Sequence, residues 1–104
     1  MIQNPTSQSH SAQQHKTFAV PLLKNLTEHY LSIYLYETAK FYAERLYYEQ
    51  PSEANLNTFA HTFYRQGKMK QTYLMLRNSS SPENRYLLGS IIFDFPYLLA
   101  LAST

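Results

Sequence analysis

Residues 52–78 read SEANLNTFAHTFYRQGKMKQTYLMLRN, and this stretch decides the fold. Its first half carries apolar residues at steps of three and four, the spacing of one helix face. These residues are Leu56, Phe59, Ala60, Phe63 and Tyr64. Gly67 then interrupts the helix, and a similar apolar stripe follows in residues 69–76. Two short amphipathic helices joined by a turn cannot bury their apolar faces alone, so the pattern predicts stacked helical neighbours and a protein-interaction scaffold rather than an enzyme.

Helical patterns continue on both sides of this pair. Pro51 ends the helix before it, because the residue that precedes a proline disfavours helical geometry. Ser52 is the expected N-cap of the next helix, and Pro96 stops the last one. The expected helices cover approximately residues 21–34, 38–49, 53–66, 68–77 and 82–95.

The chain divides by composition into three parts. Residues 1–17 are rich in Gln, Ser, Asn and His, and we expect them to form a disordered polar tail because they can bury too little apolar surface. Residues 18–95 carry the helical repeats, and residues 96–104 form an apolar tail of uncertain structure, for which no partner helix is identified. At 104 residues the chain has room for one small domain.

Composition argues against most kinds of chemical site. The chain has 2 glycines, too few for a phosphate-binding loop, and no cysteine for a disulfide or a thiolate metal site. Its 4 histidines lack the spacing of a helical zinc site, and its glutamate–lysine pairs fit ordinary ion pairs on helix surfaces. We therefore expect that the protein is not an enzyme and that it has no catalytic residue, no cofactor and no metal site. A net charge of +2 and the lack of a long apolar segment also predict no nucleic-acid partner and no membrane span.

Tyrosine is unusually frequent, with 10 residues in the chain and a dense run over residues 30–48. Such side chains combine a large apolar area with a polar tip, which suits half-buried helix surfaces and interfaces. An alternative is a stacking platform for single-stranded nucleic acid, but only Lys40 and Arg45 accompany these rings. We therefore favour core and protein interface. The candidate interface residues are Tyr34, Tyr36, Phe41, Tyr42, Tyr47, Tyr48 and Tyr64.

The pattern of residues 53–79 resembles a tetratricopeptide repeat (TPR), with Phe59, Ala60 and Phe63 in the first helix and Gly67 at the turn. Ala60 has a counterpart 33 residues earlier at Thr27 and another 29 residues later at Gly89, in the small-residue place. The resemblance implies an all-α fold in which antiparallel helix pairs stack as a TPR-like right-handed α-solenoid of about two and a half repeats.

The order of several short sequence motifs in the chain matches one family more specifically than it matches a generic TPR. Residues 41–48 resemble an ALYLAERLY-like helix, residues 62–68 a CYYRSGK-like turn, residues 72–77 an AYRLL-like helix and residues 85–89 a KYLLA-like start. Such motifs occur in this order in the N-terminal repeats of the family of anaphase-promoting complex (cyclosome) subunit 3, the cell division cycle protein 27 family, which the chain therefore resembles. The sequence after Phe95 departs from the family pattern.

This resemblance implies a ubiquitin-ligase scaffold subunit in cell-cycle control, located in the nucleus and cytoplasm. Its N-terminal repeats would hold two copies together and contact other subunits of the complex. Family members are several times longer, so we expect this chain to supply only part of that scaffold.

Other interpretations stay open at this point. The sixth subunit of the same complex has similar repeats. A generic TPR peptide-binding adaptor would use a clamp of lysine and arginine, but the basic residues here do not recur at one place in each repeat. Ser81-Pro82 is a minimal proline-directed phosphorylation site in a predicted loop.

Overall fold

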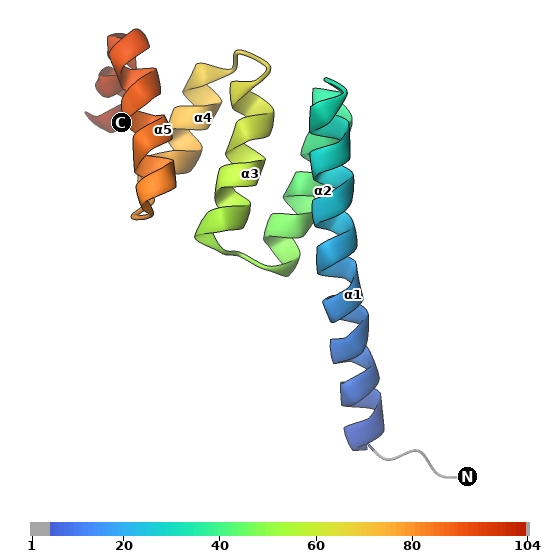
Figure 1. Ribbon diagram of the computed structural model, residues 1–104. Helices are drawn as coiled ribbons and strands as arrows, with labels where there is room; N and C mark the ends of the chain where they lie inside the picture. The colour runs from blue at the N-terminus through green and yellow to red at the C-terminus, as the bar shows by residue number, and fades with distance from the viewer. Residues whose placement is uncertain (1–4, 104) are drawn as a thin grey trace.

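The computed structural model describes the backbone of residues 5–103 and the side chains of residues 19–101. Every element in the described backbone is helical, and consecutive helices run antiparallel and pack against one another in a row (Figure 1). The structure confirms an all-α, TPR-like solenoid of about two and a half repeats. The elements are α1 (Pro5–Ser32), α2 (Tyr36–Glu49), α3 (Glu53–Tyr64), α4 (Met69–Leu76), α5 (Pro82–Asp94) and the 3₁₀ helix η1 (Pro96–Ser103).

The ends of α3 to α5 follow from local chemistry. Ser52 caps α3 as predicted, because its hydroxyl accepts a hydrogen bond from the backbone N–H of Asn55 at 3.1 Å. Ser81 caps α5 in the same way, accepting from the N–H of Asn84 at 3.2 Å. Gly67 turns the chain between α3 and α4 with a φ of 76°, a left-handed conformation that glycine adopts without steric cost.

Helix α1 begins earlier than the helix we expected from Pro21. It runs from Pro5 through Pro21, and so includes most of the segment predicted as a disordered tail. Pro21 removes one backbone donor from the helix but does not end it. Between the two prolines the sequence has no glycine and contains glutamine, alanine and lysine, which are good helix formers. Residues 1–4 lie outside the described residues.

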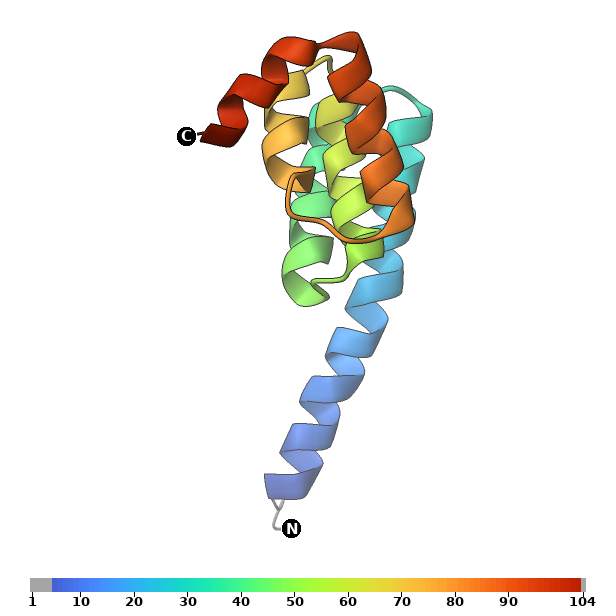
Figure 2. The same cartoon turned by 90° about the vertical axis from the view of Figure 1, so that its left-hand side faces the viewer.

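The main core lies where α3, α4, α5 and η1 meet. Six buried apolar residues form it, and partly buried leucine, methionine and aromatic side chains pack around them. Figure 2 shows η1 crossing the end of this bundle beside α5. The buried residues are Ala60, Tyr73, Leu76, Leu87, Ile91 and Leu98.

The C-terminal segment is part of that core. Residues 96–104 had no identified partner in the sequence, but Leu98 of η1 is completely buried in the cluster. The backbone N–H of Leu98 donates to the carbonyl of Phe95 at 3.0 Å, which sets the turn from α5 into η1. Thr104 lies outside the described residues.

Gly89 differs from its expected place. Its counterpart Ala60 in α3 is completely buried, whereas Gly89 is exposed and has open space around it. Ala60 is buried because α4 and α5 pack against α3. Gly89 instead lies on the face of α5 that carries the exposed side chains of Tyr86 and Phe93. The 29-residue correspondence therefore holds for the sequence but not for burial.

A polar network joins the starts of α3 and α5, and sequence patterns did not predict it. Asn84 is completely buried, and its amide donates to the backbone carbonyl of Glu53 at 3.1 Å and to the Glu53 carboxylate at 3.0 Å. The Ser79 hydroxyl also donates to that carboxylate, and Asn57 donates to the Asn84 side-chain oxygen at 2.9 Å. The network fixes α5 against α3 and the preceding loop. The signal for it is the recurrence of Ser-x-x-Asn at residues 52–55 and 81–84.

This network predicts a pH dependence of stability. The hydrogen bond from Ser79 and then that from Asn84 hold the pKa of Glu53 below its usual 4.5. A carboxyl group with a lowered folded-state pKa contributes stability above about pH 4.5, and the contribution is lost as pH falls through the folded-state pKa. We expect the urea midpoint of unfolding to fall between pH 6 and pH 3, and to fall less in Glu53→Gln. Glu83→Gln is the matched control, and an equal decline in Glu53→Gln and the wild type would contradict the assignment.

Candidate protein interface

The outer face of α2 exposes two aromatic side chains. Phe41 is 50% exposed and Tyr48 is 84% exposed. They are seven residues apart, so they lie on the same side of the helix two turns from each other. Arg45 lies between them, with its guanidinium carbon 4.5 Å from the centre of the Phe41 ring. The face therefore offers aromatic surface with one cation at its middle, a composition typical of interfaces.

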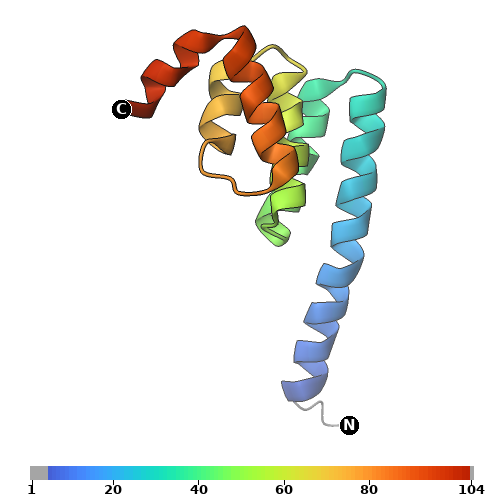
Figure 3. The same cartoon turned by 60° about the vertical axis from the view of Figure 1, so that its left-hand side comes forward.

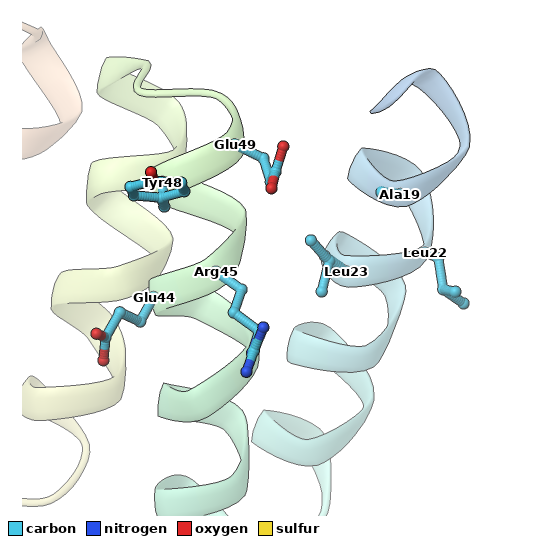
Figure 4. Close-up of a pocket in the computed structure, with 7 residues that line it drawn as sticks. All are labelled: Ala19, Leu22, Leu23, Glu44, Arg45, Tyr48 and Glu49. Atoms are coloured by element: carbon cyan, nitrogen blue, oxygen red, sulfur yellow. The ribbon is translucent and has the colours of Figure 1, made fainter. Parts of the chain in front are cut away.

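A groove of about 470 Å³ runs beside this face, between α1 and α2. Figure 4 shows Leu23 and Arg45 reaching toward the space between the two helices, while Leu22 projects from the other side of α1. Leu22 is 59% exposed. The residues that line the groove are Ala19, Leu22, Leu23, Glu44, Arg45, Tyr48 and Glu49.

Three of the predicted interface residues contact neighbouring helices instead of projecting outward. Tyr42 stacks on Tyr30 of α1, with ring centres 5.7 Å apart. Tyr47 lies against Phe59 of α3, with ring centres 6.2 Å apart. The third, Tyr64, packs against the main core. All three are half-buried, so helix packing within the chain uses most of their apolar surface.

The last two candidates lie at the turn between α1 and α2. Tyr34 is 71% exposed and has a φ of 65°, a left-handed conformation that is uncommon for a residue other than glycine. Its ring meets the ring of Tyr36 edge-on at 6.2 Å. The structure therefore places Tyr34, Phe41 and Tyr48 in exposed positions and the other candidates in half-buried ones.

The two histidines whose side chains the structure describes, His29 and His61, lie on different helices. His61 is half-buried on α3, and burial followed by the charge of Arg65 lowers its pKa. His29 lies on α1 and meets Tyr30 edge-on. The side chains of His10 and His15 lie outside the described residues. Among the side chains that the structure describes, no group of three or more histidine, aspartate or glutamate residues is arranged to hold a metal ion.

None of the helices in the described part of the chain is long and apolar enough to span a membrane.

Comparisons with known proteins agree with the fold and with the sequence resemblance. Residues 32–95 match the family model described as anaphase-promoting complex, cyclosome, subunit 3. The chain is 40% identical over 70 residues to the cell division cycle protein 27 homolog of Homo sapiens, covering 65% of this chain and 8% of that protein. It is 30% identical over 77 residues to the cell division cycle protein 27 homolog A of Arabidopsis thaliana, covering 74% of this chain and 11% of that protein.

No solved structure matches the chain. The chain spans about a tenth of the length of these relatives, and the matched region contains α2 to α5. A family match over more than half of the chain, together with the TPR-like helices, confirms the resemblance seen in the sequence. The chain belongs to the family of anaphase-promoting complex (cyclosome) subunit 3.

Proposed function

We propose that the chain is a non-catalytic protein-interaction scaffold that assembles with an anaphase-promoting complex and supports ubiquitin ligation in cell-cycle control. Membership of the subunit 3 family supports this role. The observation that carries it is the exposed aromatic face of α2 beside the α1–α2 groove, because exposed apolar surface at a groove is typical of protein contacts. Location in the nucleus and cytoplasm is part of the same proposal.

Self-association is the specific contact that we propose for this face. The groove has an apolar side formed by α1 and a charged rim of Glu44, Arg45 and Glu49. An aromatic ring such as Tyr48 of a second copy would fill the apolar part, while opposite charges on the rim would pair across a two-fold axis. Other subunits of the complex are further proposed partners.

Sedimentation equilibrium of the whole chain over a range of concentrations tests the proposal. We expect a monomer–dimer equilibrium whose dissociation constant rises about 10- to 100-fold in Tyr48→Ser, because exposed aromatic anchors dominate such interfaces. Tyr86→Ser is the matched control, since Tyr86 is 80% exposed but lies on α5, outside the groove.

Two results would contradict the self-association. A folded monomer at every concentration would favour the peptide-binding adaptor instead. An equal loss of dimer in Tyr86→Ser would place the contact on another face.

A further inference from the structure

Two lysines from different repeats converge on one carboxylate. The Nζ atom of Lys40 on α2 lies 3.1 Å from Glu37, and the Nζ atom of Lys68 in the α3–α4 turn lies 3.3 Å from the other oxygen of the same carboxylate. The lysine side chains are partly buried, at 27% and 38% exposure, whereas the glutamate side chain is 66% exposed. The cations are thus held by the fold, and the anion between them is the exposed member.

One aromatic ring supports both cations. The Nζ atoms of Lys40 and Lys68 lie 5.5 Å and 6.0 Å from the centre of the Phe63 ring. Attraction to the ring face favours each ammonium group, but it also brings two like charges close together. An anion between them relieves that repulsion, so the arrangement is built to hold a carboxylate at this point. The two lysines lower the pKa of Glu37, as expected for a carboxyl group that serves as their anion.

A cavity adjoins the carboxylate. It has a volume of about 320 Å³ and lies between the α1–α2 turn and the end of α3, which are at the same end of the solenoid (Figure 3). Its walls are mainly tyrosine and leucine side chains with one amide group. The lining residues are Tyr34, Leu35, Tyr36, Glu37, Thr38 and Gln66.

We propose that this end of the solenoid binds an acidic peptide segment, whose carboxylate replaces Glu37 between Lys40 and Lys68 while a neighbouring apolar side chain enters the cavity. Glu37 is then an internal stand-in for the ligand. Exposed ion pairs are weak, so an incoming carboxylate with additional contacts in the cavity displaces it readily. The anion that already lies between the two lysines is a carboxylate, so the spacing of the site fits that group.

This site is separate from the proposed self-association surface. Glu37 lies in the first turn of α2 and Tyr48 in its last turn, 11 residues away, which is about 16 Å along a helix. The peptide site therefore goes beyond the proposed function, and loss of self-association would leave it intact.

Fluorescence anisotropy with a labelled peptide of sequence Gly-Leu-Glu-Glu-Tyr-Gly tests the site. Both peptides carry a C-terminal amide, and the control peptide Gly-Leu-Gln-Gln-Tyr-Gly replaces the two glutamate carboxylates with neutral amides of the same shape. We expect Glu37→Gln to bind the acidic peptide at least 3-fold more tightly than the wild type, because the stand-in is removed. Adding Lys40→Met or Lys68→Met to that variant should weaken binding at least 10-fold, because methionine removes the charge while keeping a long unbranched side chain.

Lys70→Met in the same background is the matched control, because Lys70 is an exposed lysine on α4 outside the cluster. It should leave the affinity within 2-fold of Glu37→Gln. The proposal is overturned if Glu37→Gln binds both peptides equally, or if Lys70→Met weakens binding as much as Lys68→Met. Circular dichroism of each variant shows whether a loss of binding comes from unfolding, and Lys68→Arg, which keeps the charge, should then retain affinity within a few-fold.

Discussion

Replacing Leu76 with alanine is expected to lower the free energy of unfolding by about 2–5 kcal/mol. Leu76 is completely buried in the core formed by α3, α4, α5 and η1. Its removal exposes no polar group but leaves a cavity that the surrounding helices can fill only in part. Since small domains are stable by only about 5–15 kcal/mol, a loss of this size removes a large share of the total.

Urea unfolding followed by circular dichroism at 222 nm measures this loss. Leu74→Ala is the control, because Leu74 lies on the same short helix but is 40% exposed. It should change the free energy of unfolding by less than about 1 kcal/mol. An equal loss in both variants would show that burial of Leu76 is not the source, and helix propensity could not explain it either, because alanine is a better helix former than leucine.

The second large effect is expected for Asn84→Asp. The change removes the amide group that donates to Glu53 and places a second carboxylate beside the first. A lost donor at a buried site costs about 1–3 kcal/mol, and repulsion between the two carboxylates adds to this. We therefore expect a loss of about 3 kcal/mol or more at pH 7.

The pH dependence of this variant identifies the cause. Below the pKa values of the two carboxyl groups the repulsion disappears, so the gap between variant and wild type should narrow toward pH 3. Asn78→Asp makes the same chemical change at an exposed position in the loop that precedes α5, and should cost less than about 0.5 kcal/mol. A gap that is constant with pH would rule out charge repulsion as a source of the loss.

Helices α2 to α5 could be predicted to within a few residues because their ends are encoded locally. Pro51, Gly67 and Pro96 interrupt the chain, and Ser52 and Ser81 provide caps between them. Each of these signals acts over three or four residues, so it can be read without knowing the tertiary contacts.

The two ends of the chain were harder to predict because their structure does not depend on such local signals. Helix α1 begins at Pro5 and continues through Pro21, a residue that usually marks a helix boundary. The packing of η1 depends on a space for Leu98 between helices that are distant in sequence. Periodicity within residues 96–104 contains no information about that space.

The surface could be predicted only in outline. Spacing along α2 places Phe41 and Tyr48 on one side, but it cannot show that α1 and α3 leave this side exposed. Nor can it show that Tyr42 and Tyr47 contact the neighbouring helices α1 and α3. The cluster around Glu37 was missed for a different reason. Only the i,i+3 pair with Lys40 is visible in the sequence, whereas Lys68 comes from the next repeat.

The network at Asn84 also has a consequence for the order in which the chain folds. The side-chain hydrogen bonds of this network that join distant parts of the chain connect residues only 26 to 31 positions apart in the sequence. Chains whose contacts are this local pay little entropy for loop closure and fold quickly. During synthesis, α3 and α4 can form before the residues of α5 emerge. Asn84 can then form its hydrogen bonds with Glu53 as soon as α5 is made. The array can thus grow one helix at a time from its N-terminal side, and the asparagine in the first turn of each serine-capped helix bonds to a residue made earlier, Asn55 to Gln50 and Asn84 to Glu53.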